Sequence, residues 1–173
     1  IAISKIKDEL GCDRAVCISD KMYDLSMFEA ADVRVAMGNA DEETKAAADI
    51  IIDSNDKSGL VKFLLEEYIK NKLSEASNLV NIALTSISSV PNTGNDYTQR
   101  LINAIQSAQP QIDDAKNCLN TAIAVCENYS ELTTILNSIY RAKTALPASL
   151  SNGTSIQNYL SGLRTFVTEI ASA

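Results

Sequence analysis

Val16-Cys17-Ile18-Ser19-Asp20-Lys21-Met22-Tyr23-Asp24 is a short apolar run that ends in two aspartates. The run predicts a buried β-strand, and the aspartates follow its carboxyl end. Open α/β sheets bind their ligands in the crevice outside those strand ends. The chain has 173 residues and no histidine. Two carboxylates at this place therefore indicate a corner of a Mg²⁺ site rather than an acid/base pair.

Short apolar segments alternate with helical ones around this stretch. The pattern predicts strands over residues 15–18, 33–37 and 50–52. It predicts helices over residues 1–10, 24–31 and 42–48, with Gly11 ending the first helix. Short strands separated by helices favour parallel pairing through right-handed crossovers. Residues 1–71 thus predict part of a doubly wound, Rossmann-type sheet. Because helical spacing starts at the first residue, we expect the sequence to be a piece of a longer protein.

From residue 60 onward the spacing of apolar residues is helical. The apolar stripes cover residues 61–87, 97–126, 132–139 and 156–170. The first stripe predicts one long helix or two abutting ones, and Tyr159 is expected at the edge of the core. Pro110 either kinks the second helix or opens a new one. Ser151, Asn152 and Thr154 are candidate caps of the last helix.

Four amphipathic helices with short connections predict an antiparallel four-helix bundle. The charge balance changes at the same place, with 15 acidic and 9 basic side chains in residues 1–71 and 7 and 6 in residues 72–173. The fold class predicted is α/β plus all-α. We expect an α/β domain at residues 1–71 and a helical bundle domain at residues 72–173.

Composition excludes several classes of function. A net charge of −7 argues against nucleic acid as a partner. No apolar run reaches the roughly 18 residues of a membrane span, and no signal segment opens the chain, which predicts a cytoplasmic protein. The four cysteines lack the spacing of zinc ligands, and we expect buried or half-buried free thiols. They are Cys12, Cys17, Cys118 and Cys126.

Several motifs in order carry a family likeness. They are Ser19-Asp20-Lys21-Met22-Tyr23-Asp24, Val35-Ala36-Met37-Gly38-Asn39-Ala40, Lys45 with Ala46-Ala47-Ala48-Asp49, and Ser54-Asn55-Asp56-Lys57-Ser58-Gly59. Their order and spacing resemble the C-terminal part of a Cof-type phosphatase of the haloacid dehalogenase superfamily. The resemblance covers about 40% of the chain and does not extend to residues 72–173.

The resemblance implies a Mg²⁺-dependent phosphatase of small phosphorylated metabolites. It implies that Asp20 coordinates Mg²⁺ and that Asp24 is the second acid, which supports the metal shell. Asn39 and Asn55 fall on loops that border the phosphate crevice in the family. Mg²⁺ binds one or two carboxylates together with water and substrate phosphate, which suits this set.

The sequence departs from the family at Ser19, where the family has glycine, and at Tyr23, where it has asparagine. The family's nucleophilic aspartate lies on an N-terminal strand, and no Asp-x-Asp-Gly-Thr occurs here. Its phosphate-binding lysine would fall at or before Ile1. The chain therefore offers no catalytic residue of its own, and we expect catalysis only together with an N-terminal segment that carries the nucleophile.

A second interpretation belongs to another class of function. The α/β part is then a degenerate scaffold, and the bundle binds a protein partner or oligomerises. Ordinary structural roles also account for single residues: Asp20 as a turn or cap, Asp24 through the helix dipole and Asn55 through turn chemistry. Nothing in the phosphatase pattern predicts residues 72–173, which leaves open whether the two halves form a natural or an artificial fusion.

Overall fold

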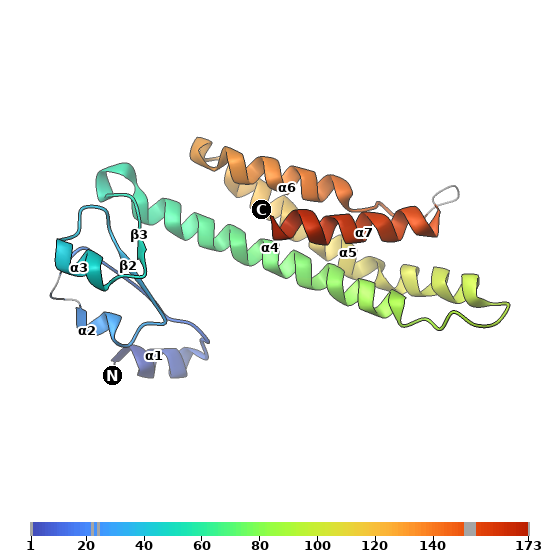
Figure 1. Cartoon of the computed structure of the whole chain (residues 1–173), viewed down its shortest axis with the longest axis horizontal. Coiled ribbons are helices and arrows are strands. Elements are labelled where there is room, and N and C mark those ends of the chain that lie inside the picture. Colours follow the sequence, from blue (N-terminus) through green and yellow to red (C-terminus); the bar gives the residue numbers. More distant parts are fainter. Residues whose placement is uncertain (1, 22, 24, 151–154, 173) are drawn as a thin grey trace. The chain divides into compact units, whose positions relative to one another are not determined.

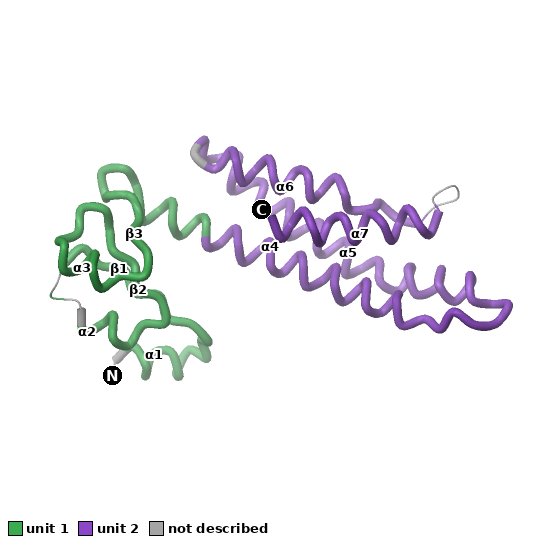
Figure 2. Tube along the Cα trace, viewed as in Figure 1, with its two compact units in different colours: residues 1–66 green, residues 67–173 purple. Residues whose placement is uncertain are grey.

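Three short strands and seven α-helices make up the described part of the chain (Figure 1). The structure is a computed structural model that describes residues 2–21, 23, 25–150 and 155–172. It divides into two compact units, Ile1–Glu66 and Glu67–Ala173 (Figure 2). Helix α4 (Gly59–Ser88) passes from one unit into the next, and the predicted boundary between residues 71 and 72 falls inside this helix.

The first unit contains a three-stranded parallel sheet in the order β1-β2-β3. Its strands are β1 (Val16–Ser19), β2 (Val33–Ala36) and β3 (Ile50–Ile51). Val16 pairs with Val33, and Val35 pairs with Ile50. The predicted alternation and parallel pairing are confirmed, although β3 is shorter than expected and β1 starts and ends one residue later than expected.

Local chemistry sets the helices of this unit. Helix α1 (Ala2–Leu10) ends at Gly11, whose φ of +63° glycine adopts readily. Helix α3 (Glu42–Ala47) starts after Asp41, whose carboxylate accepts a hydrogen bond from Thr44 N at 2.8 Å. Helix α2 (Leu25–Phe28) and the 3-10 turn η2 (Asn55–Lys57) are single turns. The predicted helix at residues 24–31 is therefore shorter than expected.

Two carboxylates connect the elements of the first unit. Asp32 Oδ2 accepts hydrogen bonds from Lys7 Nζ at 2.6 Å and from Ala15 N at 2.7 Å. Asp49 Oδ2 accepts from Arg34 N at 2.9 Å and from Arg34 Nε at 3.0 Å. The hydrogen bond from the Arg34 guanidinium is the main reason that the pKa of Asp49 falls to about 2. Asp32 thus connects α1 to the starts of β1 and β2, and Asp49 connects the start of β3 to β2.

The second unit follows the predicted apolar stripes. After α4 come α5 (Tyr97–Glu127), the 3-10 turn η3 (Ser130–Leu132), α6 (Thr133–Ala145) and α7 (Ile156–Ala171). The first stripe forms one long helix rather than two. Ser155 caps α7, because its hydroxyl accepts a hydrogen bond from Asn158 N at 3.1 Å. The predicted caps Ser151, Asn152 and Thr154 lie outside the described residues.

Helix α5 continues through Pro110, so the alternative of a new helix at this proline is wrong. Proline has no N–H, and the Gln106 carbonyl consequently loses its usual partner within the helix. Burial on the same helix offsets this cost, since Ile105 and Ile112 on either side of the proline are completely buried. The core of the unit therefore overrides the local preference of proline.

Helices α5, α6 and α7 lie alongside one another (Figure 1), with α6 in contact with both of its neighbours. Gly162 permits a close approach of α7 to the end of α6. A Cβ at this position would lie 2.7 Å from the Ala145 carbonyl oxygen. The core contains large side chains with no exposed area, among them Leu119, Ile139, Tyr159, Leu163 and Phe166. Tyr159 is thus fully buried and not at the core edge.

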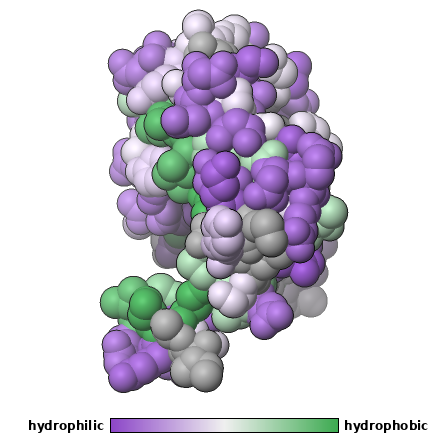
Figure 3. All heavy atoms as spheres, turned by 90° about the vertical axis from the view of Figure 1, so that its left-hand side faces the viewer, coloured by the Kyte–Doolittle hydropathy of each residue, from purple (hydrophilic) through white to green (hydrophobic). Residues whose placement is uncertain are grey.

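Several large apolar side chains of the first unit reach the surface, and Figure 3 shows apolar residues among polar ones on one face of the molecule. The set includes Ile6, Leu10, Val16, Ile50, Ile51 and Leu64. Cys12 is an exposed free thiol, which corrects the expectation of burial for that residue, whereas Cys17, Cys118 and Cys126 are buried and free. None of the described helices is long and apolar enough to cross a membrane.

Candidate functional site

The predicted site residues follow three neighbouring strands of the sheet. Asp20 comes directly after β1, Asn39 follows β2 by three residues, and Asn55 follows β3. The strands are parallel, so their carboxyl ends lie at one edge of the sheet. Asp20 is half-buried, whereas Asn39 and Asn55 are exposed. The sheet thus brings together three residues that are far apart in the sequence.

The side chain of Asn39 joins these strand ends. Its Nδ2 donates to Asp20 Oδ2 at 3.4 Å, and its Oδ1 accepts from the backbone N–H of Asn55 at 3.0 Å. The backbone N–H of Asp41 also reaches the Asp20 carbonyl oxygen at 3.4 Å. One amide therefore connects the predicted metal ligand with the loop that follows the third strand.

Two glycines allow the loops at this edge to approach one another closely. A Cβ on Gly38 would lie 2.8 Å from Ser54 N, and a Cβ on Gly59 would lie 1.9 Å from the Asp53 carbonyl oxygen. Both contacts are with backbone atoms, which cannot move aside as a flexible side chain can. The loops after β2 and β3 depend on glycine at these two positions.

Ser19 occupies its position in the strand without backbone strain. The only described non-glycine residue with positive φ is Ser58, so a serine replaces the family's glycine at ordinary backbone angles. The Ser19 hydroxyl donates to the Lys21 carbonyl and accepts from Lys21 N–H, both at 3.1 Å. It thereby stabilises the turn that carries Asp20.

Two further predictions concern Tyr23 and Asp24. The Tyr23 side chain is 86% exposed, so its ring does not pack in the interior of the first unit. Asp24, the predicted second acid, lies outside the described residues. Its part in a metal site stays a prediction.

Asp20 offers the one carboxylate among the described residues that were predicted for this site. No group of three or more His, Cys, Asp or Glu side chains that could hold a metal occurs among the described residues. Mg²⁺ does not require such a group, because it keeps several waters and binds one or two carboxylates with substrate phosphate. The half-buried Asp20 carboxylate at the strand edge is a donor of this kind. The remaining positions would fall to water, phosphate or further protein oxygens.

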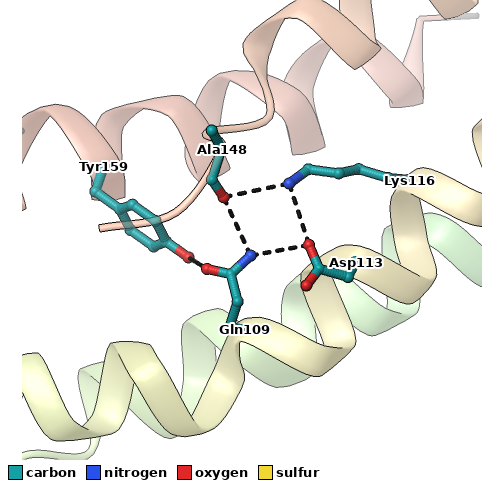
Figure 4. Close-up of polar contacts among 5 residues, drawn as sticks. All are labelled: Gln109, Asp113, Lys116, Ala148 and Tyr159. Atoms are coloured by element: carbon teal, nitrogen blue, oxygen red, sulfur yellow. Dashed lines mark hydrogen bonds and ion pairs between the residues drawn. The ribbon is translucent and has the colours of Figure 1, made fainter. Parts of the chain in front are cut away.

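A second polar cluster lies in the second unit, and no pattern in the sequence predicted it (Figure 4). Tyr159 donates its hydroxyl hydrogen to Gln109 Oε1 at 3.0 Å. Gln109 Nε2 donates to Asp113 Oδ1 at 3.0 Å and to the Ala148 carbonyl at 3.1 Å, which also accepts from Lys116 Nζ at 3.2 Å. Burial is the main cause that raises the pKa of Tyr159 to about 12. The cluster anchors the chain between α6 and α7 to α5 and has a structural role.

One groove of the second unit shows how little chemistry its lining offers. It has a volume of about 520 Å³, lies between α4 and α7 and is lined by Asn81, Leu84, Thr85, Ser88, Ser89 and Arg164. Arg164 is its only charged lining residue, and the hydroxyl side chains of the groove have no carboxylate, thiol or histidine beside them among the lining residues. The strand edge of the first unit is therefore the better candidate site.

Comparison with known proteins finds relatives of the first unit. The family described as haloacid dehalogenase-like hydrolase matches residues 2–64, which include Asp20, Asn39 and Asn55. A pyridoxal phosphate phosphatase of Escherichia coli is 40% identical over 57 residues, covering 33% of this chain and 21% of the relative. The first unit is related to the haloacid dehalogenase-like phosphatases.

Two further matches cover 28% and 35% of this chain. A phosphoglycolate phosphatase of Sulfurisphaera tokodaii is 43% identical over 49 residues, covering 28% of this chain and 22% of the relative. A solved haloacid dehalogenase-like hydrolase from Bacteroides thetaiotaomicron is 40% identical, covers 35% of this chain and 24% of that chain, and has a TM-score of 0.33. The chain spans about a fifth of the length of the phosphoglycolate phosphatase and of the pyridoxal phosphate phosphatase. The family match ends at residue 64, before the second unit begins.

Proposed function

We propose that the first unit is the metal-holding part of a Mg²⁺-dependent phosphatase site for small phosphorylated metabolites. The observation that carries this proposal is the meeting of Asp20, Asn39 and Asn55 at one strand edge, inside the segment matched by the phosphatase family. Ligands of open α/β sheets bind at this edge.

The reaction in this proposal needs a nucleophilic carboxylate from an N-terminal segment, as the family resemblance implies. That carboxylate attacks phosphorus and the P–O bond to the substrate breaks; the leaving alkoxide takes a proton from the acid that accompanies the nucleophile in the family. Water then hydrolyses the phospho-aspartyl group, which releases phosphate and restores the carboxylate. Bound Mg²⁺ would neutralise charge on the phosphoryl oxygens. Asp20 supplies an oxygen that binds the cation, and the loops of Asn39 and Asn55 border the phosphate. Alone, the 173 residues do not turn over substrate.

The exposed apolar residues of the first unit support the need for a further segment. Val16 on β1 and Ile51 on β3 are 38% and 58% exposed, at the two outer strands of the sheet. Parallel sheets in α/β domains normally have both faces covered. Leu10 on α1 is 71% exposed as well. Additional α/β structure would cover these side chains.

A magnesium titration of the full chain tests the metal part of the proposal. Millimolar Mg²⁺ should raise the melting temperature of the first unit, and Asp20→Ala should abolish this rise. Asp8→Ala is a matched control. It removes an exposed carboxylate of α1 that lies 12 residues before Asp20 in the sequence. Identical curves for the wild type and Asp20→Ala would remove the site.

The native protein tests the catalytic part. Its intact mass shows whether an Asp-x-Asp segment precedes Ile1. If it does, the native protein should hydrolyse p-nitrophenyl phosphate with Mg²⁺, and Asp20→Ala should reduce kcat/KM by at least about 100-fold, since a metal ligand contributes several kcal/mol.

For the second unit we propose a separate role in binding a protein partner or a second copy of the chain. We infer that α4, α5, α6 and α7 form an antiparallel four-helix bundle, a fold that buries its apolar stripes within itself. This unit has its own core and lies beyond the phosphatase match. An interaction or oligomerisation module is therefore the second candidate function. Light scattering of the full chain distinguishes the cases, because a self-associating module gives a mass above one chain.

A further inference from the structure

The orientation of the Asn39 amide follows from its two contacts. Oδ1 must face the N–H of Asn55, because a flipped amide would place two donors against each other at 3.0 Å. This orientation directs Nδ2 toward Asp20 Oδ2. The amide oxygen thus accepts a hydrogen bond from the Asn55 backbone, and the amide nitrogen carries hydrogens and cannot coordinate a cation. Asn39 therefore faces Asp20 with its hydrogen-bond donor and not with an oxygen that could bind a cation.

The backbone keeps Asn39 at the junction of the three strand ends. The preceding Gly38 lies against the backbone of residues 52–54, where no Cβ would fit. On the other side, Ala40 N donates to the Met37 carbonyl at 2.8 Å, and the next residue, Asp41, caps α3. Asn39 therefore has little freedom to leave the Asp20 carboxylate.

We propose that Asn39 is a positioning residue that holds the Asp20 carboxylate for divalent-cation binding. Its Nδ2 donates to Oδ2 of Asp20, which would leave Oδ1 of the same carboxylate available to a cation. Hydrogen-bond partners of metal ligands orient those ligands, and their removal typically weakens metal binding about 10–100-fold. The inference rests on the proposed function and assigns Asn39 to the carboxylate rather than to the phosphate.

The same contacts predict a link between the cation and the third strand. Asn39 joins Asp20 to the N–H of Asn55. Binding of a cation to Asp20 should therefore change the surroundings of the Asn55 N–H in the loop after β3. A purely structural Asn39 would stabilise the loops and leave the affinity for the cation unchanged. The two roles differ in what a variant does to binding rather than to stability.

The experiment measures Mg²⁺ binding by calorimetry and the metal-free melting temperature on the full chain. Asn39→Ala should raise the Kd for Mg²⁺ about 10–100-fold. Ser54→Ala is the matched control, because the Ser54 hydroxyl donates to Asp56 two residues further along, and among the described residues it has no hydrogen bond with Asp20. It should leave the Kd within about twofold of the wild type.

The outcomes separate this inference from the proposed function. If Asp20→Ala abolishes binding but Asn39→Ala keeps the wild-type Kd, the positioning role is overturned and the metal site stands. If the wild type binds no Mg²⁺, or binds it no more tightly than Asp20→Ala does, the proposed metal site and the positioning role are both overturned.

A second measurement does not depend on the folding of a variant. In wild-type protein, the side-chain amide resonances of Asn39 and the backbone amide resonance of Asn55 should shift during a Mg²⁺ titration, with the same midpoint as the calorimetric binding curve. Resonances that stay unmoved while Mg²⁺ binds would contradict the positioning role.

Discussion

The two units use the same kind of chain in different ways. Six apolar residues are buried in the described part of the first unit, against 24 in the second. Of the large apolar side chains that the structure describes as exposed, nine lie in the first unit and four in the second. The first unit has a small core and a sheet whose strand ends carry the candidate site. The second unit has a larger core and no candidate site. The larger core and the candidate site therefore belong to different units.

The largest expected effect tests whether the second unit is stabilised on its own. Phe166 has no exposed area, and Phe166→Ala should lower the free energy of unfolding of this unit by about 3–5 kcal/mol. Hydrogen exchange followed by mass spectrometry should show faster exchange in α5, α6 and α7. Exchange in β2 should stay as in the wild type, and faster exchange there would mean that the units unfold together.

A glycine substitution addresses the first unit in the same way. Gly59→Ala would place a Cβ against the Asp53 carbonyl and should cost about 3 kcal/mol through overpacking. Gly11→Ala is the matched control, with open space around it but a φ of +63°, and should cost about 1–2 kcal/mol. Denaturant unfolding measures both. Equal costs would show that the close contact at Gly59 relaxes easily.

A smaller effect concerns the polar cluster of the second unit. Tyr159→Phe removes a hydrogen bond to Gln109 and should cost about 1 kcal/mol. The pKa of Tyr159 is raised to about 12, above its ordinary value of 10.0. The unfolded state therefore loses this proton first, and stability should fall as the pH rises from 10 toward 12. Chemical unfolding at several pH values should show a weaker fall in Tyr159→Phe.

The smallest effect concerns the acid side of the first unit. Folding lowers the pKa of Asp49 from 3.8 to about 2, with the Arg34 hydrogen bond as the main cause. The stabilisation is complete above pH 3.8 and is lost as the pH falls toward 2, because the unfolded state binds the proton first. Asp49→Asn should flatten this part of the acid unfolding curve, and an unchanged curve would contradict the role of the Arg34–Asp49 contact.

Much of the first unit could be predicted because its signals are local. The alternation of short apolar runs with helices predicted the parallel strands, and Gly11 predicted the end of α1. The resemblance around Asp20 is supported by the phosphatase relatives. The length of β3 was less predictable, because pairing with β2 rather than the apolar run sets where that strand ends.

Contacts between distant residues could not be predicted in this way. Tyr159 and Gln109 are 50 residues apart, and nothing in the spacing of either residue indicates the other. The path of α5 through Pro110 depends on burial, which overrides the local preference of proline. The Asn39 amide likewise joins residues from three strand ends, and its orientation follows from partners 19 and 16 residues away.

By itself, the sequence determined the order of strands and helices, the strand-end position of Asp20 and the family likeness of the first unit. Periodicity, turn residues and motif spacing act over a few neighbouring residues, and they are therefore visible in the printed chain. Only the tertiary structure decided that Asn39 holds Asp20 and Asn55 together, that Tyr159 is fully buried and that the first unit leaves apolar residues exposed. These features arise where segments remote in sequence pack, and no local pattern specifies those contacts.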